Sequence, residues 1–136
     1  MVEFHWPVRV YYEDTDAGGV VYYANYLKFM ERARTEWLRR LGFEQDRLRE
    51  EAGVVFAVHT VHVRYLHPAR FNELLHVTVK IAEQGRTSLA FEQDVRAAAG
   101  EPLFCTGSVR VVCLDVTRLR PHAIPQRLLQ ELAIDH

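Results

Sequence analysis

Two carboxylates and a pair of glycines lie close together near the start of the chain. Asp14 and Asp16 precede Gly18 and Gly19, and a segment with helical apolar spacing begins a few residues later. The first turn of a helix exposes unpaired backbone N–H groups and carries about half a positive charge. Such donors can hold a developing oxyanion, and a nearby carboxylate can attack a carbonyl or deprotonate water. These residues therefore supply the parts of an acyl-transfer site.

The same loop also has a purely structural interpretation. An aspartate near a helix start often caps the helix, and Gly-Gly pairs are common in turns, so residue types alone favour this interpretation. A calcium-binding loop that begins at Asp14 would need an oxygen ligand from the side chain at position 18 and a glutamate at position 25. These positions are Gly18 and Asn25, so a calcium site is rejected.

Other residues that could bind a metal or catalyse a reaction give weaker signals. His59 and His62 are three residues apart, so in a strand they face opposite sides, which favours a structural role over a metal site. Cys113 lies among apolar residues, where burial raises the pKa of a thiol and keeps it inert. The chain has no glycine-rich nucleotide or phosphate loop. The sequence predicts no metal site and no cofactor.

A long helix should follow the acidic loop. Apolar side chains recur at spacings of three and four residues, which places them on one face of a helix: Tyr26, Met30, Ala33, Trp37 and Leu41. Gly42 is placed to end this helix. We expect the helix from Tyr23 or Ala24 to about Leu41. Shorter helices are expected over 44–52, ending at Gly53, and over 125–133.

Five segments have the alternation of β-strands: Trp6–Tyr12, Val54–Leu66, Leu75–Ile81, Ser88–Ala97 and Leu103–Val116. The apolar phase of the second changes near His59, which indicates either a β-bulge or a strand covered on both faces at its start. The last segment is apolar on both faces and should be a central or interface strand. Short connections predict mostly antiparallel pairing, and hence an α+β fold with the sheet wrapped over the helix.

Length and composition limit the remaining possibilities. The 136 residues contain no repeat or linker, which predicts one domain over residues 1–136. Lys and Arg number 17 and Asp and Glu 18, a net charge of −1 that argues against binding nucleic acid or an anionic membrane. No apolar stretch is long enough for membrane insertion, and no export signal is recognisable. Cys105 and Cys113 would lie about 26 Å apart in one strand, beyond disulfide reach, so we expect a cytoplasmic protein.

A long run of residues carries a family resemblance. It extends from Trp6 to Tyr22 (WPVRVYYEDTDAGGVVY) and continues in ERARTE at 31–36, in Tyr65-x-x-Pro-Ala-Arg, in TSL at 87–89 and in VVCLD at 111–115. With these motifs the sequence resembles the hotdog-fold acyl-CoA thioesterases of the 4-hydroxybenzoyl-CoA thioesterase type. It most resembles their Tol-Pal-associated (YbgC-like) branch. The resemblance implies a five-stranded antiparallel sheet wrapped around one long central helix, and it favours catalysis at the acidic loop.

The resemblance also implies roles for particular residues. Asp16 matches the catalytic carboxylate of the family, and the backbone N–H of Tyr23 matches the donor that polarises the thioester carbonyl. Relatives often have histidine in place of Tyr23, but the backbone donor survives this change. The implied substrate-binding residues are Gly19, which allows close approach of the backbone, Thr87 and Ser88 near the acyl group, and Arg86 for a phosphate of coenzyme A.

The implied activity is hydrolysis of an acyl-CoA, with a short-chain or aromatic acyl group, to a free acid and coenzyme A. Asp16 would act as nucleophile through a mixed anhydride, or as general base on water. The alternative is a protein that binds acyl-CoA or acyl-carrier protein, with a structural or partner role and little turnover. Dehydration of an acyl-CoA is a third possibility, but it uses an Asp–His pair and this loop has no histidine. The family pairs into a homodimer or homotetramer with active sites at the dimer interface.

Overall fold

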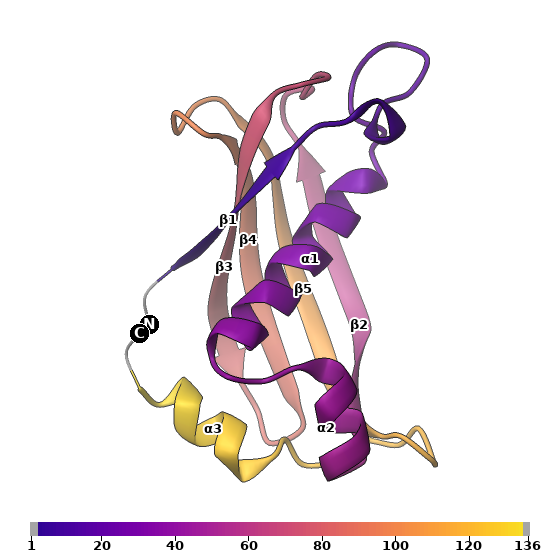
Figure 1. Cartoon of the computed structure of the whole chain (residues 1–136), viewed down its shortest axis with the longest axis vertical. Helices are drawn as coiled ribbons and strands as arrows, with labels where there is room; N and C mark the ends of the chain where they lie inside the picture. The colour runs from indigo at the N-terminus through magenta and orange to yellow at the C-terminus, as the bar shows by residue number, and fades with distance from the viewer. Residues whose placement is uncertain (1–2, 135–136) are drawn as a thin grey trace.

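One antiparallel sheet forms the framework of the computed structural model, which describes residues 3–134. Its order is β1-β3-β4-β5-β2. The strands are β1 (Phe4–Arg9), β2 (Val54–Tyr65), β3 (Leu74–Gln84), β4 (Ser88–Ala97) and β5 (Leu103–Asp115). Helix α1 (Asn25–Arg40) lies across one face of this sheet, while α2 (Gln45–Ala52) and α3 (Gln126–Leu132) lie near the end where α1 finishes (Figure 1). The predicted α+β class with a five-stranded antiparallel sheet is confirmed.

The apolar face of α1 is the centre of the core. All five residues of the predicted stripe are buried, as are two more residues of the helix, Phe29 and Leu38. The helix begins at Asn25, slightly later than predicted, and ends at Arg40. No helix among residues 3–134 is long and apolar enough to cross a membrane.

The C-terminal end of α1 is closed by the predicted glycine. Gly42 has φ +96°, a left-handed conformation that costs glycine little. The N–H of Gly42 donates to the carbonyl of Arg39 at 3.0 Å, and the N–H of Phe43 donates to that of Leu38 at 3.0 Å. This pair of bonds satisfies two carbonyls that the helix leaves open, as in a Schellman motif.

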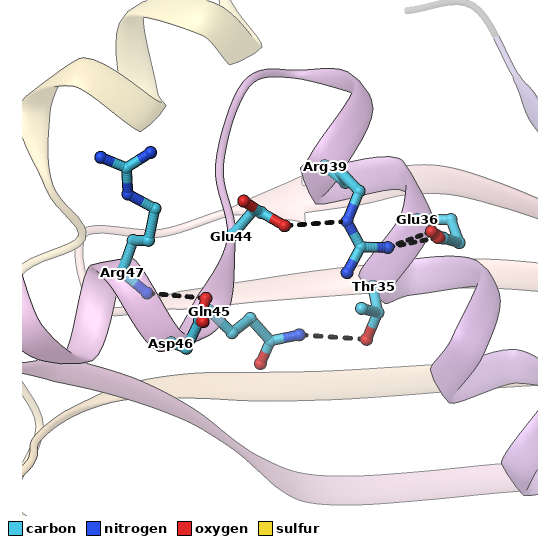
Figure 2. A network of polar contacts seen from close by, with 7 residues as sticks. All are labelled: Thr35, Glu36, Arg39, Glu44, Gln45, Asp46 and Arg47. Atoms are coloured by element: carbon cyan, nitrogen blue, oxygen red, sulfur yellow. Dashed lines mark hydrogen bonds and ion pairs between the residues drawn. The ribbon is translucent and has the colours of Figure 1, made fainter.

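Surface side chains hold the junction between α1 and α2. Arg39 contacts Glu36 one turn earlier, and its Nε donates to Glu44 Oε1 at 3.2 Å (Figure 2). Gln45 Nε2 donates to Thr35 Oγ1 at 3.0 Å. The carboxylates of Glu44 and Glu36 raise the pKa of the Arg39 guanidinium. These contacts set the direction of α2 but lie at the surface, where such pairs contribute little stability.

The strand assignments settle two expectations. The register of β2 against β5 shifts between Val58 and Thr60, so a β-bulge explains the change of apolar phase. Strand β5 lies between β4 and β2, which confirms it as a central strand. The edges of the sheet are β1 and β2.

A buried glutamine joins α1 to the sheet. Gln93, 1% exposed, donates through Nε2 to the carbonyls of Met30 at 3.1 Å and Thr78 at 3.2 Å. Its Oε1 accepts from Nη1 of Arg34 at 2.9 Å. Burial lowers the pKa of Arg34. The neutral amide of Gln93 therefore accepts a hydrogen bond from the largely desolvated guanidinium of Arg34. It also links α1 to the neighbouring strands β3 and β4.

Replacing Gln93 with leucine should lower the free energy of unfolding by about 2–3 kcal/mol, because Arg34 and two carbonyls lose a buried partner. Urea unfolding measures this change. The exposed Gln84→Leu variant is the matched control and should differ little from wild type. Adding Arg34→Met to Gln93→Leu should recover part of the loss, since both polar partners are then removed. An unchanged unfolding midpoint in Gln93→Leu would contradict this account.

Candidate active site

The loop between β1 and α1 is fastened at several points. Val21 donates its N–H to the carbonyl of Ala69 at 2.8 Å, and isolated β-bridges join Val20 to Arg70 and Thr15 to Val21. The N–H of Ala69 in turn donates to the hydroxyl of Tyr26 in α1 at 3.1 Å. The loop is therefore tied both to the segment before β3 and to the helix that it precedes.

Asp16 sits in a tight turn within this loop. Its Oδ1 accepts the N–H of Gly18 at 2.8 Å, and its backbone N–H donates to the carbonyl of Val20 at 2.9 Å. The N–H of Gly19 donates to the carbonyl of Asp16 at 3.0 Å, and Gly19 has φ +78°, which the turn requires. Asp16 is exposed, and within residues 3–134 its other carboxylate oxygen accepts no hydrogen bond. One oxygen thus orients the side chain while the other is available for chemistry.

Backbone donors at the start of α1 lie a few residues further along. The N-cap is Ala24, which has no side chain that could satisfy them. The N–H of Asn25 donates to the carbonyl of Tyr22 at 2.8 Å. Among the described residues, no acceptor meets the N–H of Tyr23. This is the donor that the sequence predicted to polarise the carbonyl of the substrate.

Aromatic rings surround this helix end. The exposed ring of Tyr23 lies 4.8 Å from that of Tyr22 and 6.0 Å from that of Tyr65, which is 5.6 Å from that of Tyr26. The Tyr22 hydroxyl donates a hydrogen bond to that of Tyr23, which raises the pKa of Tyr22, and burial raises the pKa of Tyr65 and Tyr26. These three phenols stay neutral at pH 7 and serve as walls or hydrogen-bond partners. Sequence reasoning did not assign Tyr22, Tyr26 or Tyr65 to the site. Tyr22 and Tyr26 are near Tyr23 in sequence, whereas Tyr65 comes beside it only through the tertiary fold.

The other predicted site residues lie at the opposite end of the sheet (Figure 1). Arg86 and Thr87 form the β3–β4 turn, and their carbonyls accept the N–H groups of Ile124 at 2.9 Å and Cys113 at 2.7 Å. Ser88 Oγ accepts from Nη1 of Arg110 at 3.2 Å. One chain therefore places Asp16, Gly19 and Tyr23 in the β1–α1 connection at one end of the sheet, and Arg86, Thr87 and Ser88 at the other end.

A family model described as the thioesterase-like superfamily matches residues 10–132. The chain belongs to the thioesterase-like superfamily. It is 46% identical over 128 residues to an acyl-CoA thioester hydrolase YbgC of Escherichia coli O6:H1, covering 94% of each chain. It is 44% identical over 125 residues to the acyl-CoA thioesterase YbgC of Haemophilus influenzae, covering 92% of this chain and 90% of that one. These findings confirm the predicted family, its YbgC-like branch and the assignment to the thioester hydrolases.

The fold of this chain is similar to that of a thioesterase whose structure has been solved. A 4-hydroxybenzoyl-CoA thioesterase, crystallised as an Asp-to-Asn mutant with 4-hydroxybenzoyl-CoA, matches with a TM-score of 0.87. The identity is 20%, and the match covers 95% of this chain and 97% of the other. The predicted hotdog fold is confirmed by this likeness.

Proposed function

We propose that the chain hydrolyses acyl-CoA thioesters to a free acid and coenzyme A, at a site built around Asp16 and the N-terminus of α1. One observation carries the proposal: a carboxylate with a free oxygen is held in the loop that leads to the unpaired N–H of Tyr23, just before the N-cap of α1. The acyl-CoA thioester hydrolases among the relatives support it.

The proposed reaction uses these two groups. The thioester carbonyl oxygen accepts the N–H of Tyr23, where the helix dipole stabilises the oxyanion. The free oxygen of Asp16 attacks the carbonyl carbon, the C–S bond breaks, and water hydrolyses the resulting mixed anhydride. In the alternative, Asp16 takes a proton from the water that attacks. Because a thiol has a pKa near 8.5, the thiolate of coenzyme A can depart without a strong general acid. Gly19 has no side chain, which allows the substrate to approach the backbone closely.

A second copy of the chain would complete the site. Strand β2 is an edge of twelve residues without proline or lysine, and it exposes Val58 and Val61. The other edge, β1, is six residues long and contains Pro7, a feature that blocks pairing. We therefore propose that two copies pair antiparallel along β2, as a homodimer or as half of a homotetramer.

This pairing would unite the separated halves of the site. A two-fold axis across antiparallel strands reverses the second copy, so its far end comes beside the Asp16 end of the first. The partner would then contribute Thr87 and Ser88 near the acyl group and Arg86 for a phosphate of coenzyme A. Charge complementarity with the phosphates would rest on such local arginines, because the net charge of the chain is −1.

The alternative function is binding of acyl-CoA or acyl-carrier protein with little turnover. The tyrosine at position 23 motivates it, since a phenol stands where relatives often have an imidazole. A panel of short-chain, aromatic and long-chain acyl-CoAs, assayed by release of free thiol, separates the two functions. We expect catalytic turnover, strongest on short-chain or aromatic acyl groups. Saturable binding across the whole panel without thiol release would favour the alternative.

The proposal also includes the cellular location of the chain and the system in which it acts. We propose that the chain acts as one domain in the cytoplasm, which the two free cysteines, Cys105 and Cys113, support. We also propose a link to the Tol-Pal system, from the resemblance to that branch. The identity of the genes that neighbour its own gene tests this link.

A further inference from the structure

The two carboxylates of the loop have opposite environments. Asp16 is exposed, whereas Asp14 is only 5% exposed and all its acceptor atoms are occupied. Its Oδ2 accepts the N–H of Tyr11 at 2.8 Å, and its Oδ1 accepts from Nδ2 of Asn25 at 2.9 Å. Its backbone carbonyl accepts the N–H of Tyr22 at 2.9 Å. With neither carboxylate oxygen free, Asp14 cannot attack a substrate or take a proton from water.

The partner of Asp14 in α1 is itself buried. Asn25 is 7% exposed and is the first residue of the helix. No Lys or Arg side chain pairs with Asp14 among residues 3–134, so its charge is met by hydrogen bonds alone. A buried carboxylate is costly unless such bonds are made, so loss of either bond should move the backbone.

These contacts close the loop that carries Asp16. The Asp14–Asn25 bond joins the residue two positions before Asp16 to the residue two positions after Tyr23. The bond from Tyr22 to the Asp14 carbonyl fixes the same two segments a second time. We call the Asp14–Asn25 bond the clasp. Together with the Tyr22–Asp14 bond it constrains the segment of Asp16 relative to that of Tyr23.

We propose that Asp14 and Asn25 are positioning residues, whose clasp holds the Asp16 carboxylate in register with the oxyanion donor of α1. The inference rests on the proposed function and deepens it. Asp14 does not touch the substrate. It acts through the geometry of Asp16 and Tyr23, and a misplacement of about 1 Å can lower a rate on the order of 10²-fold.

Exchange of the two side chains tests the clasp. Asn25→Asp alone sets two carboxylates against each other and should lower kcat on the order of 30-fold or more, with KM changed less than about 3-fold. The double variant Asp14→Asn/Asn25→Asp restores one amide and one carboxylate, and the new amide can donate to the new carboxylate while still accepting from Tyr11. Its kcat should return to within about 5-fold of wild type.

Matched measurements separate the clasp from other roles. Asn72→Asp makes the same chemical change at an exposed position and should leave kcat unchanged. Thermal unfolding of each variant shows that the enzyme assayed is folded. A folded Asn25→Asp variant with wild-type kcat, or a folded double variant as inactive as Asn25→Asp, would overturn the clasp. Absence of turnover in the wild type would overturn the proposed function instead.

Discussion

The Asp16→Asn variant is expected to release thiol from acyl-CoA on the order of 10³-fold more slowly than wild type. An amide can neither attack the thioester carbonyl nor take a proton from water. The substitution preserves the turn, because the amide oxygen can still accept the N–H of Gly18 that Oδ1 accepts now. The loss should therefore fall on kcat and leave the fold intact. Steady-state thiol release at saturating substrate measures it.

Two controls make this result specific. Glu13→Gln neutralises an exposed carboxylate three residues earlier and should retain wild-type turnover. The thermal midpoint and the oligomeric state of Asp16→Asn should match those of wild type, because Asp16 is exposed and its only side-chain bond among residues 3–134 lies within the turn. Turnover in Asp16→Asn equal to that of Glu13→Gln would remove Asp16 from the mechanism.

The Val58→Lys variant should separate the two copies and lower kcat/KM by about 10²-fold or more, because each site would lose the partner's half. Val58 is 52% exposed on the β2 edge, so lysine there leaves the core of one chain intact. Val58 pairs with the buried Val111 on the apolar face of the sheet, so pairing of two copies there would desolvate the charge of a lysine. Light scattering at micromolar concentration gives the oligomeric state, and thiol release gives the activity.

The control for this variant lies on the same strand. His62 is exposed and follows the bulge, and in the alternation of the strand it belongs to the face opposite Val61 and Val63. His62→Lys should therefore keep the pairing and the activity. A fully active monomer of Val58→Lys would contradict a site shared between copies, while an unchanged dimer would contradict pairing along β2.

Periodic features of the chain were predictable from sequence. The stripe on α1 appears as apolar residues three and four apart, and its end appears as Gly42, where the backbone takes φ +96°. The change of phase near His59 was visible too, and the register shift between Val58 and Thr60 decides between its two explanations. Local patterns of this kind depend on near neighbours, which sequence displays directly.

The roles of the two loop aspartates could not be separated in the same way. Asp14 and Asp16 are the same residue type two positions apart, and either could have been the buried one. What distinguishes them is the amide of Asn25, eleven residues after Asp14. The ring of Tyr65 beside Tyr23 is likewise a contact between β2 and the start of α1. Such contacts depend on the tertiary fold, as does the separation of Arg86 from Asp16 within one chain.

Product analysis in ¹⁸O-labelled water would show directly whether the chain hydrolyses acyl-CoA. Purified protein is incubated with the acyl-CoA that gives the fastest thiol release, and thiol and acid are quantified over many turnovers. We expect one coenzyme A thiol and one carboxylic acid per turnover, with ¹⁸O incorporated into the acid. Bound acyl-CoA that yields neither product would contradict it, as would acid that carries no ¹⁸O.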